Sequence, residues 1–142
     1  MKFNRFLPLM AFLSLLNPGM ARADLAAIRV VVSDLSPMAG TVEISLFNSA
    51  QSYLKEPYLQ EAGVPDENGT VEVSFPDLRE GEYAVVVVHD ANDNGKLDKG
   101  FFGLGGESYG YSNGAQGWLG QPSFEKVKVT VTAPETRIEI EL

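Results

Sequence analysis

A chain of 142 residues without cysteine cannot be a disulfide-stabilised scaffold, so packing or a metal must hold its core. The formal net charge of −8 argues against nucleic acid as a partner, because an acidic surface repels phosphate groups. A local concentration of acids could instead attract a divalent cation.

The first 23 residues have the organisation of a secretory signal peptide. Lys2 and Arg5 precede the apolar run 6–16, and Ala21 and Ala23 fit an A-x-A cleavage site. The run is shorter than the roughly 20 residues that span a bilayer, so we expect no membrane insertion. We expect export to the periplasm or the medium, cleavage after Ala23, and one domain over residues 24–142 with a formal net charge of −11.

Five later segments alternate apolar and polar residues, as half-buried strands do. They are 27–33, 41–47, 70–75, 126–131 and 136–142. The segment 82–90 is apolar at both parities, which is typical of a central strand covered on both faces. Turn residues separate the segments, and only 49–62 favours a helical turn, which Pro57 would end. The pattern predicts an all-β chain folded as an antiparallel β-sandwich.

A long glycine- and aromatic-rich loop is expected between the strand that ends near His89 and the one that starts near Lys126. Loops of this length in a compact domain are usually functional or disordered, and aromatic residues are scarce in disordered chains. The aromatic residues are Phe101, Phe102, Tyr109, Tyr111, Trp118 and Phe124. They favour a satellite core, and the alternative is a carbohydrate- or peptide-binding platform that uses Tyr109, Tyr111 and Trp118.

The start of this loop has the composition of a calcium site, because residues 89–103 read "HDANDNGKLDKGFFG". Counted from Asp90, side-chain oxygens fall at positions 1, 3, 5 and 9 of a calcium loop, which are Asp90, Asn92, Asn94 and Asp98. Gly95 falls at position 6, where the loop bends sharply, and Lys96 offers its main-chain carbonyl at position 7. The spacing predicts that these residues bind calcium.

Two features distinguish the loop from an EF-hand. Position 12 is Phe101 where a bidentate glutamate belongs, and a strand precedes the loop where a helix belongs. Calcium takes about six to eight oxygens, so water, backbone carbonyls or a distant acid such as Glu107 must complete the site. The alternative is a metal-free Asx turn of the same composition. Asp93, which lies between ligand positions, is expected to point away from the ion.

Residues 75–115 and 122–131 resemble the bacterial secreted-protein family catalogued as domain of unknown function 2141, and the likeness extends over most of the mature chain, including residues 40–57. In that family the acidic loop is usually followed by a G-x-P-x-E-x-Y-G-F-S-N pattern. The matching residues are Gly103, Glu107, Tyr109, Gly110, Ser112 and Asn113, while Gly105 replaces the proline and Tyr111 the phenylalanine. The resemblance implies an exported β-sandwich of unestablished function. More distantly, the F-x-x-L-x-x-G-x-Y-x-V pattern at 75–85 is similar to transthyretin-like and carboxypeptidase-regulatory-like sandwich domains.

Catalysis is not expected, because a Ser–His–Asp hydrolase would have to use His89, the only histidine. Asp90 is its neighbour in the sequence, and neighbouring strand residues point to opposite faces. Ser108 and Ser112 are the nearby nucleophile candidates, and neither lies in a nucleophile-elbow motif.

Two functions therefore stay open. The first is an exported, non-catalytic module of unknown role with a structural calcium loop. The second is a ligand-binding module that recognises a carbohydrate or peptide through the aromatic loop 101–124. A glycan, a peptide or an envelope component would be the partner, and the sequence leaves the oligomeric state open.

Overall fold

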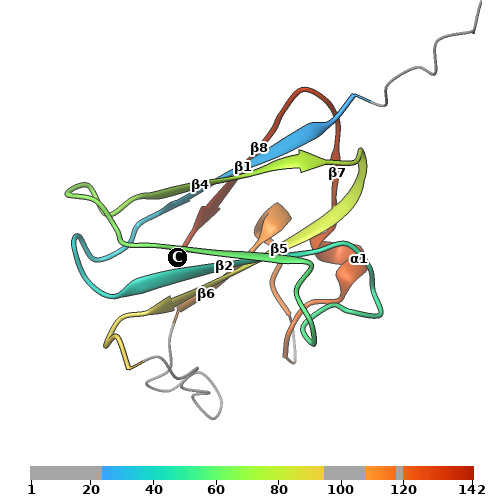
Figure 1. The fold of residues 1–142 in the computed structure, drawn as a ribbon. Helices are drawn as coiled ribbons and strands as arrows, with labels where there is room; N and C mark the ends of the chain where they lie inside the picture. The colour runs from blue at the N-terminus through green and yellow to red at the C-terminus, as the bar shows by residue number, and fades with distance from the viewer. Residues whose placement is uncertain (1–23, 95–107, 118–119) are drawn as a thin grey trace, which may run out of the picture.

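The computed structural model describes residues 24–94, 108–117 and 120–142 (Figure 1). The predicted signal peptide, residues 1–23, lies outside these ranges. The described chain forms two β-sheets that pack face to face, so the predicted all-β sandwich is confirmed.

Eight strands and two short helical elements follow one another along the described chain. The strands are β1 (Ala26–Ser33), β2 (Thr41–Phe47), β3 (Leu59–Gly63), β4 (Val71–Leu78), β5 (Gly81–Asp90), β6 (Ser108–Tyr111), β7 (Val129–Val131) and β8 (Thr136–Glu141). The 3₁₀ turn η2 (Ser112–Gly114) and the α-helix α1 (Phe124–Val127) lie between β6 and β7.

The smaller sheet has the strand order β4-β1-β8, and the larger sheet has the order β3-β2-β5-β6. β7 pairs with residues 81–83 of β5, whereas β6 pairs with residues 86–89. The pair formed by β1 and β8 is parallel, and the other strand pairs of the described residues are antiparallel. The sandwich is therefore mainly antiparallel, with one parallel pair that the sequence pattern did not predict.

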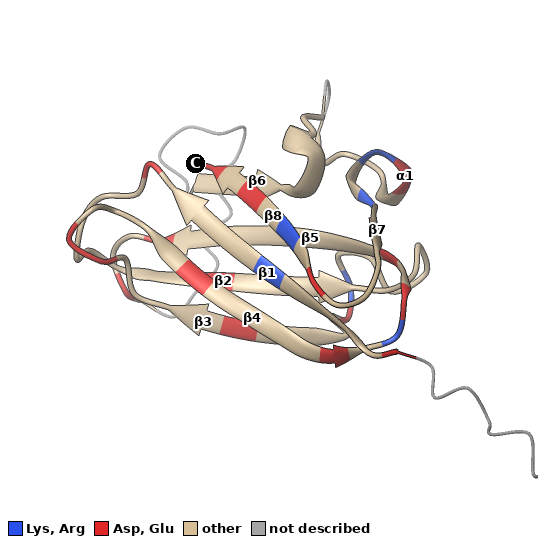
Figure 2. Ribbon diagram, turned by 90° about the horizontal axis from the view of Figure 1, so that it is seen from above, with Lys and Arg blue, Asp and Glu red and all other residues tan. Residues whose placement is uncertain are grey.

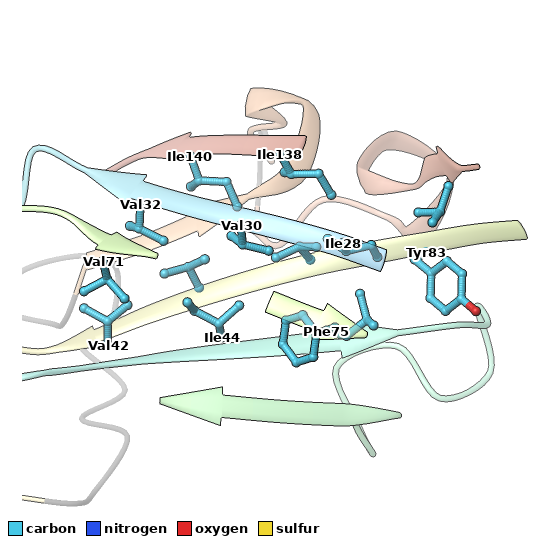
Figure 3. Close-up of a cluster of buried hydrophobic side chains, with 14 of the residues drawn as sticks. Ile28, Val30, Val32, Val42, Ile44, Val71, Phe75, Tyr83, Ile138 and Ile140 are labelled. Carbon is cyan, nitrogen blue, oxygen red and sulfur yellow. The ribbon is translucent and has the colours of Figure 1, made fainter. Parts of the chain in front are cut away.

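The main core lies between the two sheets. Ile28, Val30 and Val32 of β1 are fully buried and face Val42 and Ile44 of β2 (Figure 3). Burying an aliphatic side chain of this size contributes roughly 1.5 to 3 kcal/mol, so this cluster supplies the main stabilisation of a chain without disulfides.

A second apolar cluster covers one end of the outer face of the larger sheet. It consists of Phe47, Tyr53, Ala84, Val86, Phe124 and Val127. The side chains of β5 alternate between the clusters, because Val85 and Val87 lie in the main core and Ala84 and Val86 in the second. The prediction of a central strand covered on both faces is confirmed.

The segment predicted as one strand at 126–131 divides into two elements. Residues 124–127 form α1, and the strand begins only at Val129. Phe124 and Val127, three residues apart, bury the same face of this helical turn against the second cluster. Tertiary packing therefore overrides the alternating pattern at the start of the segment.

Acidic residues are spread over the strands of both sheets and over turns at both ends of the sandwich (Figure 2). Acidic residues that are dispersed in this way are typical of a hydrated surface and do not form a single acidic patch. In the part of the chain that the structure describes, no helix has the length and apolar character needed to cross a membrane.

Candidate functional site

The acidic loop begins where β5 leaves the larger sheet. β5 stays paired with β2 up to its last residue, Asp90, which lies opposite Thr41. Because strand side chains alternate, Asp90 and His89 point to opposite faces of the sheet. Asp90 is only 8% exposed, so the first predicted ligand lies at a paired and largely buried strand end.

Side-chain oxygens in the first half of the loop turn inward toward one backbone amide. The N–H of Asn94 donates to Oδ1 of Asn92 at 3.1 Å and to Oδ1 of Asp90 at 3.4 Å. Two oxygens that share one donor must lie close to each other. Loop positions 1 and 3 therefore face the same interior, as a cation site requires and as an Asx turn also allows.

The end of the turn between β1 and β2 and the first residue of β2 contact the end of β5 and the start of the loop. The carbonyl oxygen of Ala39 accepts a hydrogen bond from Nε2 of His89 at 2.9 Å. Gly40 packs directly against the backbone of Asp90 and Ala91. The hydroxyl of Thr41 donates to Oδ1 of Asp93 at 2.6 Å, so the carboxylate of Asp93 is directed at β2.

The structure covers only part of the predicted ligand set. Asp90, Asn92 and Asn94 lie within the described residues, whereas Lys96, Asp98 and Glu107 lie outside them. Among the described residues, no group of three or more His, Cys, Asp or Glu side chains could hold a metal ion. The described part of the loop thus offers one carboxylate and two side-chain amides as potential ligands.

The serines that the sequence offered as nucleophiles occupy different places. Ser108 lies opposite His89 in the pairing of β5 with β6, and it is exposed. Ser112 is fully buried, and its hydroxyl is held at Val85, four residues before His89 on the same strand. No Ser–His–Asp arrangement is formed by Asp90, His89 and Ser112.

Ser112 bridges a gap in the strand pairing of β5. Val85 lies between the stretch that pairs with β6 and the stretch that pairs with β7. The Ser112 hydroxyl oxygen accepts the N–H of Val85 at 2.9 Å and donates to the carbonyl of Val127 at 2.6 Å. The side chain of Ser112 therefore takes the place of a neighbouring strand as the hydrogen-bond partner of these two backbone groups.

Asn113 and Gly110 of the same motif also have structural contacts. The amide nitrogen of Asn113 donates to the carbonyl of Val127, the last residue of α1, at 3.2 Å and to that of Lys128, the next residue, at 2.7 Å. A Cβ on Gly110 would lie 2.4 Å from Cγ2 of Ile140, so glycine allows β6 to approach β8 closely. Gly110, Ser112 and Asn113 of the motif therefore each have a structural role in this fold.

The three aromatic residues of the predicted platform differ in their surroundings. Tyr111 packs against the second apolar cluster, and burial raises the pKa of its hydroxyl. Tyr109 is 36% exposed, and Trp118 lies outside the described residues. Phe124 is buried in the cluster as well, so part of the aromatic set forms a satellite core.

The contacts of Ala39, Gly40 and Thr41 were not predicted from the sequence. These residues lie about 50 positions before the loop, and no local pattern links them to it. Gly40 carried the only signal, because it ends the turn sequence "PMAG" at residues 37–40.

Comparison with known proteins gives one match. Residues 30–139 match the family described as "Uncharacterized protein conserved in bacteria (DUF2141)". Neither the curated proteins nor the solved structures contain a match to the chain.

Proposed function

Because the chain belongs to the DUF2141 family of uncharacterised bacterial proteins, and because its acidic loop follows a strand end that is paired with β2, we propose that it is an exported, non-catalytic β-sandwich module whose loop binds calcium. The ion stiffens the loop, and the wider biological role is not assigned. Asp90, Asn92, Asn94 and Asp98 bind through side-chain oxygens, Lys96 through its carbonyl, and Glu107 completes the set.

The observation that carries this proposal is the inward orientation of the first two ligand positions. Oδ1 of Asp90 and Oδ1 of Asn92 both accept the N–H of Asn94, so they already face one point. Hard oxygen ligands from carboxylates and amides are those that calcium prefers. With only two acids at ligand positions, we expect a dissociation constant on the order of 10⁻⁴ to 10⁻³ M.

Calcium titration of the purified protein, by calorimetry and by thermal unfolding, tests the proposal. At a free calcium concentration about 100 times the dissociation constant, binding adds roughly 2.7 kcal/mol to the free energy of unfolding. The melting temperature should then rise by several degrees, and a chelator should reverse the rise. Asp90→Ala should abolish both the heat of binding and the rise.

Asp66 provides the matched control, because it forms a comparable Asx turn outside the loop. Its Oδ1 accepts the N–H groups of Asn68 and Thr70, both at 2.9 Å. Asp66→Ala removes a turn carboxylate and should keep the full calcium response. If wild type gives no heat and its melting temperature ignores calcium and chelator alike, the loop is a metal-free Asx turn.

The non-catalytic part of the proposal rests on the positions of His89, Asp90 and Ser112. His89 hydrogen-bonds to the carbonyl of Ala39, Asp90 points to the other face, and Ser112 is buried in the β5 pairing gap. We expect no turnover of ester, peptide or glycoside substrates. Turnover by wild type that is lost in His89→Ala would contradict this.

Glycan or peptide binding is the second candidate, and the exposure of Tyr109 favours it. Tyr109 lies opposite Val88 on the outer face of the larger sheet, and it is not one of the residues that the second cluster buries. A glycan and peptide array probed with wild type and Tyr109→Ala would decide it, since a ligand of this face should be lost in the variant.

A further inference from the structure

The turn between β3 and β4 carries an acceptor motif for N-linked glycans. Residues 68–70 read Asn-Gly-Thr, which fits the pattern N-x-S/T with a central residue other than proline. Asn68 is the only asparagine of the sequence that is followed two positions later by serine or threonine. Such a motif can be used only where it lies on the surface of an exported protein. The place of Asn68 in the fold therefore decides whether the motif is accessible.

Asn68 lies at the tip of a tight turn that leads from the larger sheet to the smaller one. The carbonyl of Asp66 accepts the N–H of Gly69 at 3.0 Å, so Glu67 and Asn68 are the two central residues of a β-turn. The N–H of Asp66 donates to the carbonyl of Thr70 at 2.9 Å and closes the turn. Asp66, Glu67 and Asn68 are all exposed. The motif thus has the surface position that a modification requires.

The inner side of the turn is held by groups other than the Asn68 side chain. Oδ1 of Asp66 accepts the N–H groups of Asn68 and Thr70, both at 2.9 Å. The carbonyl of the buried Gly69 accepts the N–H of Leu35 at 3.1 Å, and a Cβ at Gly69 would lie 2.2 Å from the carbonyl oxygen of Leu35. The turn is therefore fixed to the connection between β1 and β2 through Gly69. A group attached to the Asn68 carboxamide would replace none of these contacts.

We propose that Asn68 is the acceptor of an N-linked glycan. The co-substrate is an oligosaccharide joined through pyrophosphate to a polyprenyl lipid, and a membrane-bound oligosaccharyltransferase catalyses the transfer. The carboxamide nitrogen of Asn68 bonds to C1 of the first sugar and loses a proton. The bond from C1 to the pyrophosphate oxygen breaks, and the lipid pyrophosphate leaves with the electron pair. This inference rests on the export that is part of the proposed function, because it places the chain where such donors are used.

Glycosylation of the purified full chain in vitro tests the acceptor independently of export. The reagents are a lipid-linked oligosaccharide of known mass and a detergent-solubilised bacterial oligosaccharyltransferase whose acceptor motif includes an acidic residue two positions before the asparagine. Asp66 occupies that position. We expect the intact mass of wild type to rise by one glycan, carried on the peptide that contains Asn68. The mass shift should be lost in Asn68→Gln.

Two variants of Thr70 form a matched pair. Thr70→Val removes the hydroxyl that the motif requires but keeps the branched shape, so the mass shift should be lost, whereas Thr70→Ser should keep it. The hydrogen bonds of Thr70 to Asp66 use its backbone groups, so both variants should fold, and thermal unfolding checks this. A mass shift that persists in Asn68→Gln, or that Thr70→Val leaves unchanged, overturns the proposal.

A synthetic peptide of residues 64–72 and an arm in living cells separate the remaining outcomes. A wild-type chain without a mass shift overturns the proposal, and glycosylation of the peptide alone would show that the folded turn hides Asn68. In bacteria that carry the transferase and its donor, the chain with its own signal peptide should be modified. If these cells retain an unmodified chain with its signal peptide attached, export fails, whereas a mass shift in vitro still identifies Asn68 as a competent acceptor. An exported and processed chain that stays unmodified in these cells overturns the proposal.

Discussion

Ser112 shows how one hydroxyl can take the place of a missing strand partner. It satisfies the N–H of Val85 and the carbonyl of Val127 inside a fully buried site. Ser112→Ala leaves both groups without their partner, so we expect the free energy of unfolding to fall by about 1 to 3 kcal/mol. Urea denaturation measures this. Ser108→Ala, at an exposed position of the neighbouring strand, should change it by less than about 0.5 kcal/mol.

Asn113 combines a left-handed backbone with a side chain that binds the carbonyls at the end of α1. Its φ is 64°, and its amide donates to the carbonyls of Val127 and Lys128. Alanine loses these bonds and is strained at this φ, whereas glycine loses only the bonds. Thermal unfolding should therefore rank wild type above Asn113→Gly and Asn113→Gly above Asn113→Ala. The reverse order of the two variants would show that the backbone conformation is not limiting.

Tyr53 carries a buried hydroxyl with no hydrogen-bond partner among the described residues. A buried hydroxyl without a partner costs about 1 to 3 kcal/mol, so Tyr53→Phe should leave the stability unchanged or raise it. Burial, and secondarily the neighbouring Tyr111, raise the pKa of Tyr53 to about 12. The neutral hydroxyl is favoured in the folded state, so wild type should lose stability as the pH rises from 10 toward 12.

The Tyr53→Phe variant should lose less stability over the same pH range. Denaturant unfolding of both proteins at pH 8 and near pH 11 compares them. A large destabilisation of the variant at neutral pH would mean that the hydroxyl has a partner after all, such as a bound water.

At the scale of elements, two surface ion pairs of one arginine link β1 to β4 and to the residue before β8. Arg29 of β1 contacts Glu72 of β4 and Glu135, which precedes β8. Its hydrogen bond to Glu135 lowers the pKa of that carboxyl below 4.5. Because the pKa of Glu135 is lower in the folded state than in the unfolded state, the ion pair stabilises the fold at any pH above the unfolded-state pKa. This contribution is lost as the pH falls through the folded-state pKa.

Arg29→Met should therefore raise the pKa of Glu135 toward its ordinary value. It should also reduce the loss of stability that wild type suffers below pH 4.5. Carboxyl titration by NMR measures the pKa directly. A Glu135 pKa that is the same in both proteins would show that the ion pair does not form in solution.

The same scale shows which strands could be predicted from the sequence. β1, β2, β4, β5 and β8 alternate or are continuously apolar, because one or both of their faces lie against a core. β3 was missed because nearly all of its residues are exposed, so it carries no apolar pattern. β6 was missed because it is short and contains Gly110, which packs where a side chain would not fit.

At the scale of the whole molecule, the sequence spacing identified the candidate ligand positions of the acidic loop, but it did not predict the contacts that the loop makes with the rest of the chain. Positions 90, 92 and 94 follow a local pattern that can be read directly. The anchoring by Gly40 and Thr41 depends on the pairing of β2 with β5, which brings together residues about 50 positions apart. The Ser112 contact also joins distant residues, Val85 and Val127, and no local pattern reveals it.

The most direct test of the proposed calcium binding is a structure of the protein determined with calcium at about 10 mM, above the expected dissociation constant. We expect one ion bound by side-chain oxygens of Asp90, Asn92 and Asn94 at about 2.3 to 2.6 Å, with the carboxylate of Asp93 still on Thr41. A structure in which Asp90 and Asn92 keep only the Asn94 amide between them, with no ion present, would contradict it.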